Sequence, residues 1–214
     1  MELLKKANGN IPRTEEEKLK MIEEAAVHYG RFMDVVIPGW RQESGSIDTP
    51  KRVAKSFIND LVKSIHGEFP KITHFDNEMK YDGIVAQCNI PVRTICMHHH
   101  LPVFGSCHVG YVVPPDGKII GLSKLNKIVS YWSHMPQTQE SMCMQVHDTL
   151  NEILEGNRGI AVVIHATHLC TCHRGVYHDS EMHTAKMSGL FFDNEIGTRA
   201  EFYKMVENSL RLKR

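Results

Sequence analysis

The stretch Gly159-Ile160-Ala161-Val162-Val163-Ile164 (GIAVVI) decides the fold class of this chain. A continuous apolar run of this length, rich in β-branched residues, predicts a strand that is covered on both faces. The alternating run at 108–113 predicts a second strand, and the turn sequence PPDG at 114–117 separates it from a third at 118–120. A further run rich in β-formers occupies residues 84–95, so the second half of the chain is expected to contain a sheet.

The first part of the chain reads as helical instead. Thr14 with Glu17 forms a capping box before apolar residues at helical spacing, and Pro38-Gly39 ends that helix. Thr49 is predicted to be the N-cap of a second helix, with Pro50 at the first helical position. These two helices define an expected N-terminal helical region.

Further helices are predicted between and after the strands. Ser123 is expected to cap one helix, a second begins beyond Pro136, and Thr198 with Glu201 forms a capping box that opens the last one. The resulting order is helices, strands, a helix pair, strands and a helix. This order favours an α+β fold over alternating β and α units.

Composition limits the function classes. The chain has 214 residues, which suits an N-terminal helical region at 1–66 and one compact domain at 67–214. Lys+Arg and Asp+Glu are equal at 25 each, so no global basic field suggests nucleic acid. No apolar stretch approaches the ~20 residues that span a membrane, and the N-terminus has no signal-peptide core. We therefore expect a cytoplasmic protein without a nucleic-acid or membrane partner.

Cysteine and histidine gather in two short segments, CMHHHLP at 96–102 and HLCTCH at 168–173. Clustered thiolates and imidazoles in a reducing compartment are typical of metal sites, and zinc is the metal they suit best. Cys96 and His99 have a common ligand spacing, and Cys170 is the natural third ligand. With three protein ligands a zinc ion keeps its fourth position for water, which then ionises near pH ~7. The prediction is a zinc-dependent hydrolytic site.

The two segments contain more donors than one ion needs. If Cys170 and Cys172 both lay on a regular strand, they would share a face, and Cys172 could close the site into a structural one. His98 and His168 are candidates for proton transfer, because an imidazole titrates near neutral pH. Either histidine could instead bind the metal or orient a ligand, and spacing alone does not separate His98 from its two histidine neighbours.

A set of basic and hydroxyl side chains indicates an anionic substrate such as a polyphosphate. The alternative to a substrate-binding role is that these side chains are ordinary solvated groups on the protein surface. The Gln139-Glu140 pair adds a possible guanine contact, because a carboxylate accepts two hydrogen bonds from the guanine edge and an amide can add another. Taken singly, Glu140 would be an ordinary exposed helix residue. The candidate anion contacts are Arg52, Lys55, Ser123, Lys124, Lys127 and Arg174.

The chain resembles the GTP cyclohydrolase I family over roughly residues 15–210. Several long motifs occur in the family's order, which makes the resemblance specific. They are TPKRVAKSF (49–57), FPKITHF (69–75), the Cys96/His98/His99 block with Gly105, HVGYVVP (108–114), IGLSKLNKIV (120–129), PQTQE (136–140), AVVIHATHLC (161–170), RGV (174–176) and TRAEF (198–202).

The resemblance implies a tunnelling fold (T-fold), in which antiparallel sheets from several subunits close into a barrel with helices outside. It also implies a homodecamer with active sites at subunit interfaces, and conversion of GTP to 7,8-dihydroneopterin triphosphate and formate with Zn²⁺. By position, the zinc ligands are Cys96, His99 and Cys170, and the catalytic histidines are His98 and His168. Gln139 and Glu140 are implied to read guanine, and the six anion contacts above to hold the triphosphate.

The resemblance further implies that His98 protonates a ring nitrogen as the guanine imidazole opens, and that His168 assists ribose opening. The chain departs from the family where Met97 replaces a usual Glu, Lys127 a usual Arg and Met135 another Arg. Lys127 therefore offers a point charge where Arg would offer a bidentate contact. Two alternatives stay open: a non-catalytic zinc T-fold protein that binds a purine nucleotide, and a related enzyme acting on a modified purine nucleotide.

Overall fold

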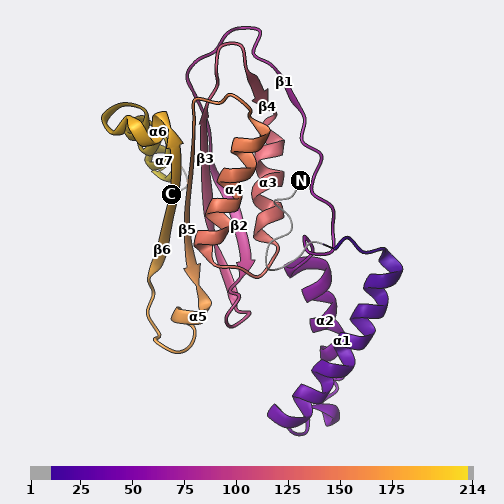
Figure 1. Ribbon diagram of the computed structural model, residues 1–214. Helices are drawn as coiled ribbons and strands as arrows, with labels where there is room; N and C mark the ends of the chain where they lie inside the picture. The colour runs from indigo at the N-terminus through magenta and orange to yellow at the C-terminus, as the bar shows by residue number, and fades with distance from the viewer. Residues whose placement is uncertain (1–10, 212–214) are drawn as a thin grey trace. The chain divides into compact units, whose positions relative to one another are not determined.

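The computed structural model describes residues 11–211 of the chain (Figure 1). Two compact units follow one another, the first ending at Phe69 and the second beginning at Pro70. Residues 1–10 of the predicted N-terminal region lie outside the described part. Among the described helices, none is both long enough and apolar enough to cross a membrane.

The first unit begins with helix α1 (Glu15–Val36). The predicted capping box is confirmed, since the Glu17 amide donates to Thr14 Oγ1 at 3.2 Å and the Thr14 amide donates to Glu17 Oε2 at 2.8 Å. The helix ends one residue before Ile37, just ahead of the predicted Pro38-Gly39 breaker. A short 3-10 turn, Trp40–Gln42, follows it.

Helix α2 (Thr49–Ser56) starts one residue earlier than predicted. Its N-cap is Asp48, so the assignment of Thr49 as the cap is wrong by one position. Proline is tolerated at either of the first two helical positions because the amide that it lacks would have no intrahelical partner. A π-helical turn, Phe57–Leu61, extends α2, and buried side chains join the two helices of this unit: Ile22, Ala54 and Ile58.

The second unit is built on a four-stranded antiparallel sheet with the order β2-β3-β5-β6. Its strands are β2 (Ile84–Ile95), β3 (Pro102–Val112), β5 (Gly159–His168) and β6 (Glu181–Gly189). The prediction from GIAVVI is confirmed, because all six of these residues are buried in β5, an inner strand. The α+β class with an antiparallel sheet is likewise confirmed.

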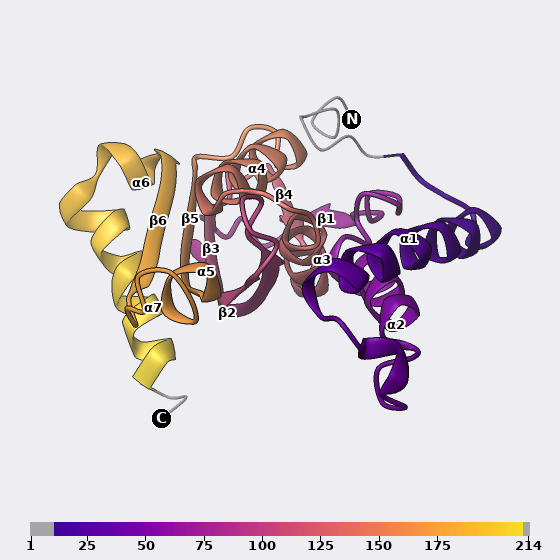
Figure 2. The same cartoon turned by 90° about the horizontal axis from the view of Figure 1, so that it is seen from below.

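Helices cover both faces of this sheet (Figure 2). α3 (Leu122–Ser133) and α4 (Gln139–Ile153) lie on one face, and α6 (Leu190–Asp193) and α7 (Ala200–Arg211) on the other. Phe191 and Phe202 of the second pair pack on Ala161 and Val163 of β5. Alternate residues of β5 thus pack against the helices on opposite faces of the sheet. Both sets are buried, which explains the continuous apolar run in its sequence.

Two further predicted helix caps are wrong. α3 begins at Leu122 with Gly121 as its N-cap, so Ser123 lies inside the first turn as an exposed residue. Thr198 lies within a π-helical turn, Glu195–Arg199, that precedes α7. The cap of that turn is Asn194, whose Oδ1 accepts from the Gly197 amide at 3.0 Å. A cap one turn upstream satisfies the helix start equally well, so the local motif was ambiguous.

Gly105 sets the spacing between β3 and β5. A Cβ at this position would lie 2.0 Å from the carbonyl oxygen of His165 and 2.6 Å from Cα of Ala166. Because both obstacles are backbone or close to it, no rotamer change could relieve the clash. The close approach brings the ends of β3 and β5 together where the cysteine and histidine segments emerge.

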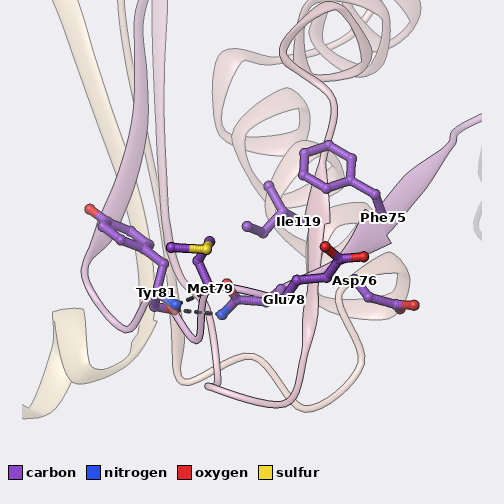
Figure 3. Close-up of a pocket in the computed structure, with 7 residues that line it drawn as sticks. Phe75, Asp76, Glu78, Met79, Tyr81 and Ile119 are labelled. Carbon is purple, nitrogen blue, oxygen red and sulfur yellow. Dashed lines mark hydrogen bonds between the residues drawn. The ribbon is translucent and has the colours of Figure 1, made fainter.

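The strands β1 (His74–Asp76) and β4 (Lys118–Ile120) form a separate two-stranded sheet. The predicted turn between β3 and β4 is confirmed by a hydrogen bond from the Gly117 amide to the Pro114 carbonyl at 2.9 Å. Buried Asn77 ties the loop after β1 to this turn, donating to carbonyls of Tyr81 and Pro114. An open pocket of about 360 Å³ lies beside this loop, and Figure 3 shows residues that line it. Its lining residues differ from every predicted site residue, so it is not the candidate site.

Candidate functional site

The loop that joins β2 to β3 carries the first cysteine and histidine segment. Ile95 and Pro102 are the last paired residues of the two strands, and the Cys96 amide donates to the Leu101 carbonyl at 2.9 Å. Within the loop the His100 amide donates to the Cys96 carbonyl at 2.8 Å, and His100 has a left-handed φ of 53°. This tight reversal gathers the cysteine and the three histidines at one end of the sheet.

The second segment emerges beside that loop. β5 ends at His168, which pairs with Val103, and the chain then forms the single turn α5 (Leu169–Cys172). The turn is closed by Thr171 Oγ1, which donates to the His168 carbonyl at 2.9 Å. Cys170 packs against a small buried cluster that includes Cys96 and Val103. The pairing of β3 with β5 therefore brings both segments to one point.

Three donor atoms meet there. Within residues 11–211, the group that could hold a metal ion comprises Cys96, His99 and Cys170, whose ligand atoms lie within 4.8 Å of one another. Cys96 Sγ lies 3.9 Å from His99 Nδ1. In a tetrahedral zinc site with metal–ligand bonds of ~2.0–2.3 Å, a sulfur and a nitrogen donor are separated by about 3.5–3.6 Å and two sulfur donors by about 3.8 Å. The donor set and its spacing fit three positions of such a site and leave the fourth for a small ligand.

Cys172 does not share a face with Cys170. Both lie in α5, where two residues correspond to a rotation of about 200° around the helix axis. The idea that Cys172 closes the site required a regular strand through both cysteines, and that premise is wrong. His98 is closer, with Nδ1 3.6 Å from Cys96 Sγ, and its ring lies 6.3 Å from that of His99. It adjoins the three-donor group as a polar neighbour.

The surroundings of Cys170 affect its protonation. Burial, and next the hydrogen-bonded thiol of Cys96, raises the pKa of Cys170, while the guanidinium of Arg174 acts in the opposite direction. A bound divalent cation would favour the thiolate far more strongly than Arg174 does. Arg174 itself is exposed and lies two residues beyond the end of α5.

His168 is held by Gln139. His168 Nε2 lies 2.9 Å from Gln139 Oε1, and Gln139 is 6% exposed at the start of α4. The amide nitrogen of Gln139 donates to the carbonyls of Ile164 at 3.2 Å and Met182 at 2.9 Å, and to Thr184 Oγ1 at 3.2 Å. The predicted guanine reader thus has every polar atom of its side chain engaged inside the protein.

Glu140 lies next to this pair and has an exposed side chain. Burial lowers the pKa of His168, and the negative charge of Glu140 acts in the opposite direction. His168 therefore favours the neutral ring at physiological pH, which is the form that can accept a proton.

The predicted anion contacts lie on separate elements. Ser123 and Lys127 are exposed on α3, where Lys124 is half-buried. Arg52 and Lys55 are exposed on α2 in the first unit, where Arg52 pairs with Asp48 at 3.4 Å.

Sequence reasoning missed Thr184, which contacts Gln139 from β6. The signal was present in Glu181–Met187, where half-buried Met182 and Thr184 alternate with exposed neighbours. This short alternation was overlooked beside the stronger runs.

Comparisons with known proteins agree on one family. A family model described as GTP cyclohydrolase I matches residues 37–207. A protein named GTP cyclohydrolase 1 from Aeromonas hydrophila is 37% identical over 72% of this chain and 70% of its own length. Proteins of the same name from Flavobacterium johnsoniae and Shewanella denitrificans are 38% and 33% identical, covering 74% and 92% of this chain and 70% and 89% of their own lengths. The chain therefore belongs to the GTP cyclohydrolase I family of enzymes.

Proposed function

We propose that this protein is a zinc-dependent GTP cyclohydrolase I, which converts GTP to 7,8-dihydroneopterin triphosphate and formate. One observation carries the proposal: three metal donors, Cys96, His99 and Cys170, converge beside two further histidines. A zinc ion bound by three protein ligands keeps an open position, which is the usual mark of a catalytic site.

Cys96, His99 and Cys170 would hold the metal, with Cys172 outside the ligand set. When bound, zinc supplies a Lewis acid that lowers the pKa of a water ligand to about 7. The thiols must lose their protons on metal binding, so occupancy should increase with pH.

The proposed reaction opens and rebuilds the guanine ring. Water adds to C8, the C8–N9 bond breaks, and His98 donates a proton to the departing ring nitrogen. A second water breaks the C8–N7 bond and releases C8 as formate. His168 then moves protons during ribose opening and rearrangement, and closure of the pterin ring returns one water. The balance is GTP plus one water giving formate and 7,8-dihydroneopterin triphosphate.

The substrate contacts remain predictions. Glu140, with its exposed carboxylate, suits the donor edge of guanine. The amide of Gln139, its predicted companion, is engaged by His168 and the sheet. The basic residues suit the triphosphate: Arg52, Lys55, Ser123, Lys124, Lys127 and Arg174. The catalytic domain is taken as residues 67–214, the assembly as a homodecamer and the location as the cytoplasm, all three from the sequence and its family resemblance.

The test is turnover of GTP by the zinc-loaded full-length protein, followed by pterin absorbance and formate. We expect both products from the native protein, and their loss in His98→Ala and in Cys170→Ser. The two variants separate the roles, because His98→Ala should retain zinc and Cys170→Ser should not. Full zinc occupancy of the native protein without turnover would contradict the proposal and favour a nucleotide-binding protein, whereas turnover of a modified purine nucleotide alone would favour a related enzyme.

A further inference from the structure

The orientation of the Gln139 amide is determined by its surroundings. Its Nε2 faces the carbonyl oxygens of Ile164 and Met182, at 3.2 and 2.9 Å, and both groups can only accept hydrogen bonds. A flipped amide would set Oε1 against two carbonyl oxygens with no hydrogen between them. The amide nitrogen must therefore face the sheet, and Oε1 must face His168.

This orientation assigns the tautomer of His168. Oε1 of Gln139 can only accept, so His168 Nε2, 2.9 Å away, must carry the hydrogen. In the neutral ring the lone pair then lies on Nδ1.

Gln139, which contacts His168, is itself fixed by several hydrogen bonds. Gln139 stands at the first turn of α4, whose N-cap Thr138 accepts from the Ser141 amide at 3.2 Å. Its amide hydrogen bonds reach β5 and β6, two strands that pair from Gly159 to Thr167 of β5. The contact to His168 therefore joins a helix, two strands and the imidazole in one network.

We propose that Gln139 is a positioning residue for His168: it fixes the ring plane and the Nε2–H tautomer, and thereby presents Nδ1 as the proton acceptor. The expected effect on turnover rests on the proposed function, whereas the assignment of the tautomer rests on the hydrogen bonds alone. In this proposal the Gln139 side chain acts by orienting His168, and Glu140 is the side chain that contacts guanine.

The tautomer is tested first, without reference to activity. Full-length protein labelled with ¹⁵N-histidine is measured by magic-angle-spinning NMR at pH 8, with His168→Gln identifying the His168 signals. We expect a protonated Nε2 and an unprotonated Nδ1 in the native protein, and an added Nδ1–H population in Gln139→Met. A native His168 protonated on Nδ1 would overturn the proposal.

Kinetics then separate positioning from guanine binding. Gln139→Met is nearly isosteric, and we expect kcat to fall about 10- to 100-fold while KM for GTP stays within about threefold. The matched control is Gln145→Met, an equally buried glutamine of the same helix whose amide donates to Ser141. It should leave both constants near native values. A large rise in KM with kcat preserved would overturn the proposal in favour of guanine binding.

The two tests keep the hypotheses apart. If native protein shows no GTP turnover, the proposed function fails while the NMR result still decides the tautomer. If Gln139→Met does not fold, the native spectrum alone decides, because the Nδ1–H form would contradict the inference without any variant.

Discussion

Cys96 is the first residue after β2, and Cys170 lies in the helical turn after β5, yet their sulfur atoms lie within 4.8 Å of each other. β3 lies between these strands and pairs with both. The metal geometry is therefore a property of the sheet, and local sequence spacing determines only part of it. Changes to the ligands and changes to the sheet should consequently have different effects.

Zinc content should depend on Cys170 and not on Cys172. Cys170→Ser removes one of three donors, so we expect it to abolish stoichiometric zinc binding, whereas Cys172→Ser should keep one zinc per chain. Metal analysis of dialysed protein measures both. X-ray absorption of the native protein should show two sulfur ligands; three sulfurs, or zinc loss in Cys172→Ser, would contradict the assignment.

Gly105→Ala should disrupt the approach of β3 to β5. The new methyl group would lie 2.0 Å from the His165 carbonyl oxygen, so we expect a loss of roughly 3 kcal/mol or more in the free energy of unfolding, or failure to fold. Gly45→Ala is the control, since a Cβ there meets no atom within 4 Å. Denaturant titration compares the two; equal stabilities would show that the sheet can relax.

Buried thiols should make the protein less stable in alkali. Burial raises the pKa of Cys143 to about 11, against about 8.5 for an unfolded cysteine. The unfolded state thus loses its proton first, and stability present below pH ~8.5 is lost as the pH rises toward 11. Between these values Cys143→Ala should show a slope of unfolding free energy against pH that is shallower by up to about 1.4 kcal/mol per unit. Identical slopes in the two proteins would refute this.

Lys127→Arg should strengthen binding of the triphosphate if Lys127 contacts it. A guanidinium offers bidentate contacts where the ammonium offers a point charge, so we expect KM for GTP to fall several-fold. Lys204→Arg, an equally conservative change at an exposed position of α7, is the control. The prediction fails if the two variants have the same KM.

Sequence predicted the strong elements of the fold because their patterns were long. The run at 84–95 was predicted with the bounds of β2, and the run at 159–164 gave the start of β5, which continues to His168. Apolar runs of this kind report burial directly. Caps were predicted less well. Thr14 was correct, whereas Thr49, Ser123 and Thr198 were not, because a hydroxyl near a helix start caps the helix only if the helical backbone begins right after it.

The residue types of the site could be predicted from the sequence, but the contacts between these residues could not. The clustering of cysteine and histidine predicted Cys96, His99 and Cys170 as metal ligands, and the structure brings these three together. The sequence could not show that α5 turns Cys172 away, because a four-residue helical turn has no sequence period to detect. Nor could it reveal the contact between Gln139 and His168, which joins two elements far apart in the chain.

The fate of guanine C8 tests the central claim most directly. The zinc-loaded protein would be incubated with GTP carrying ¹³C at C8 and followed by ¹³C NMR. We predict that the label leaves the nucleotide and appears as formate, one formate for each GTP consumed over repeated turnovers. Label that stays in intact GTP, with one zinc bound per chain, would contradict the account.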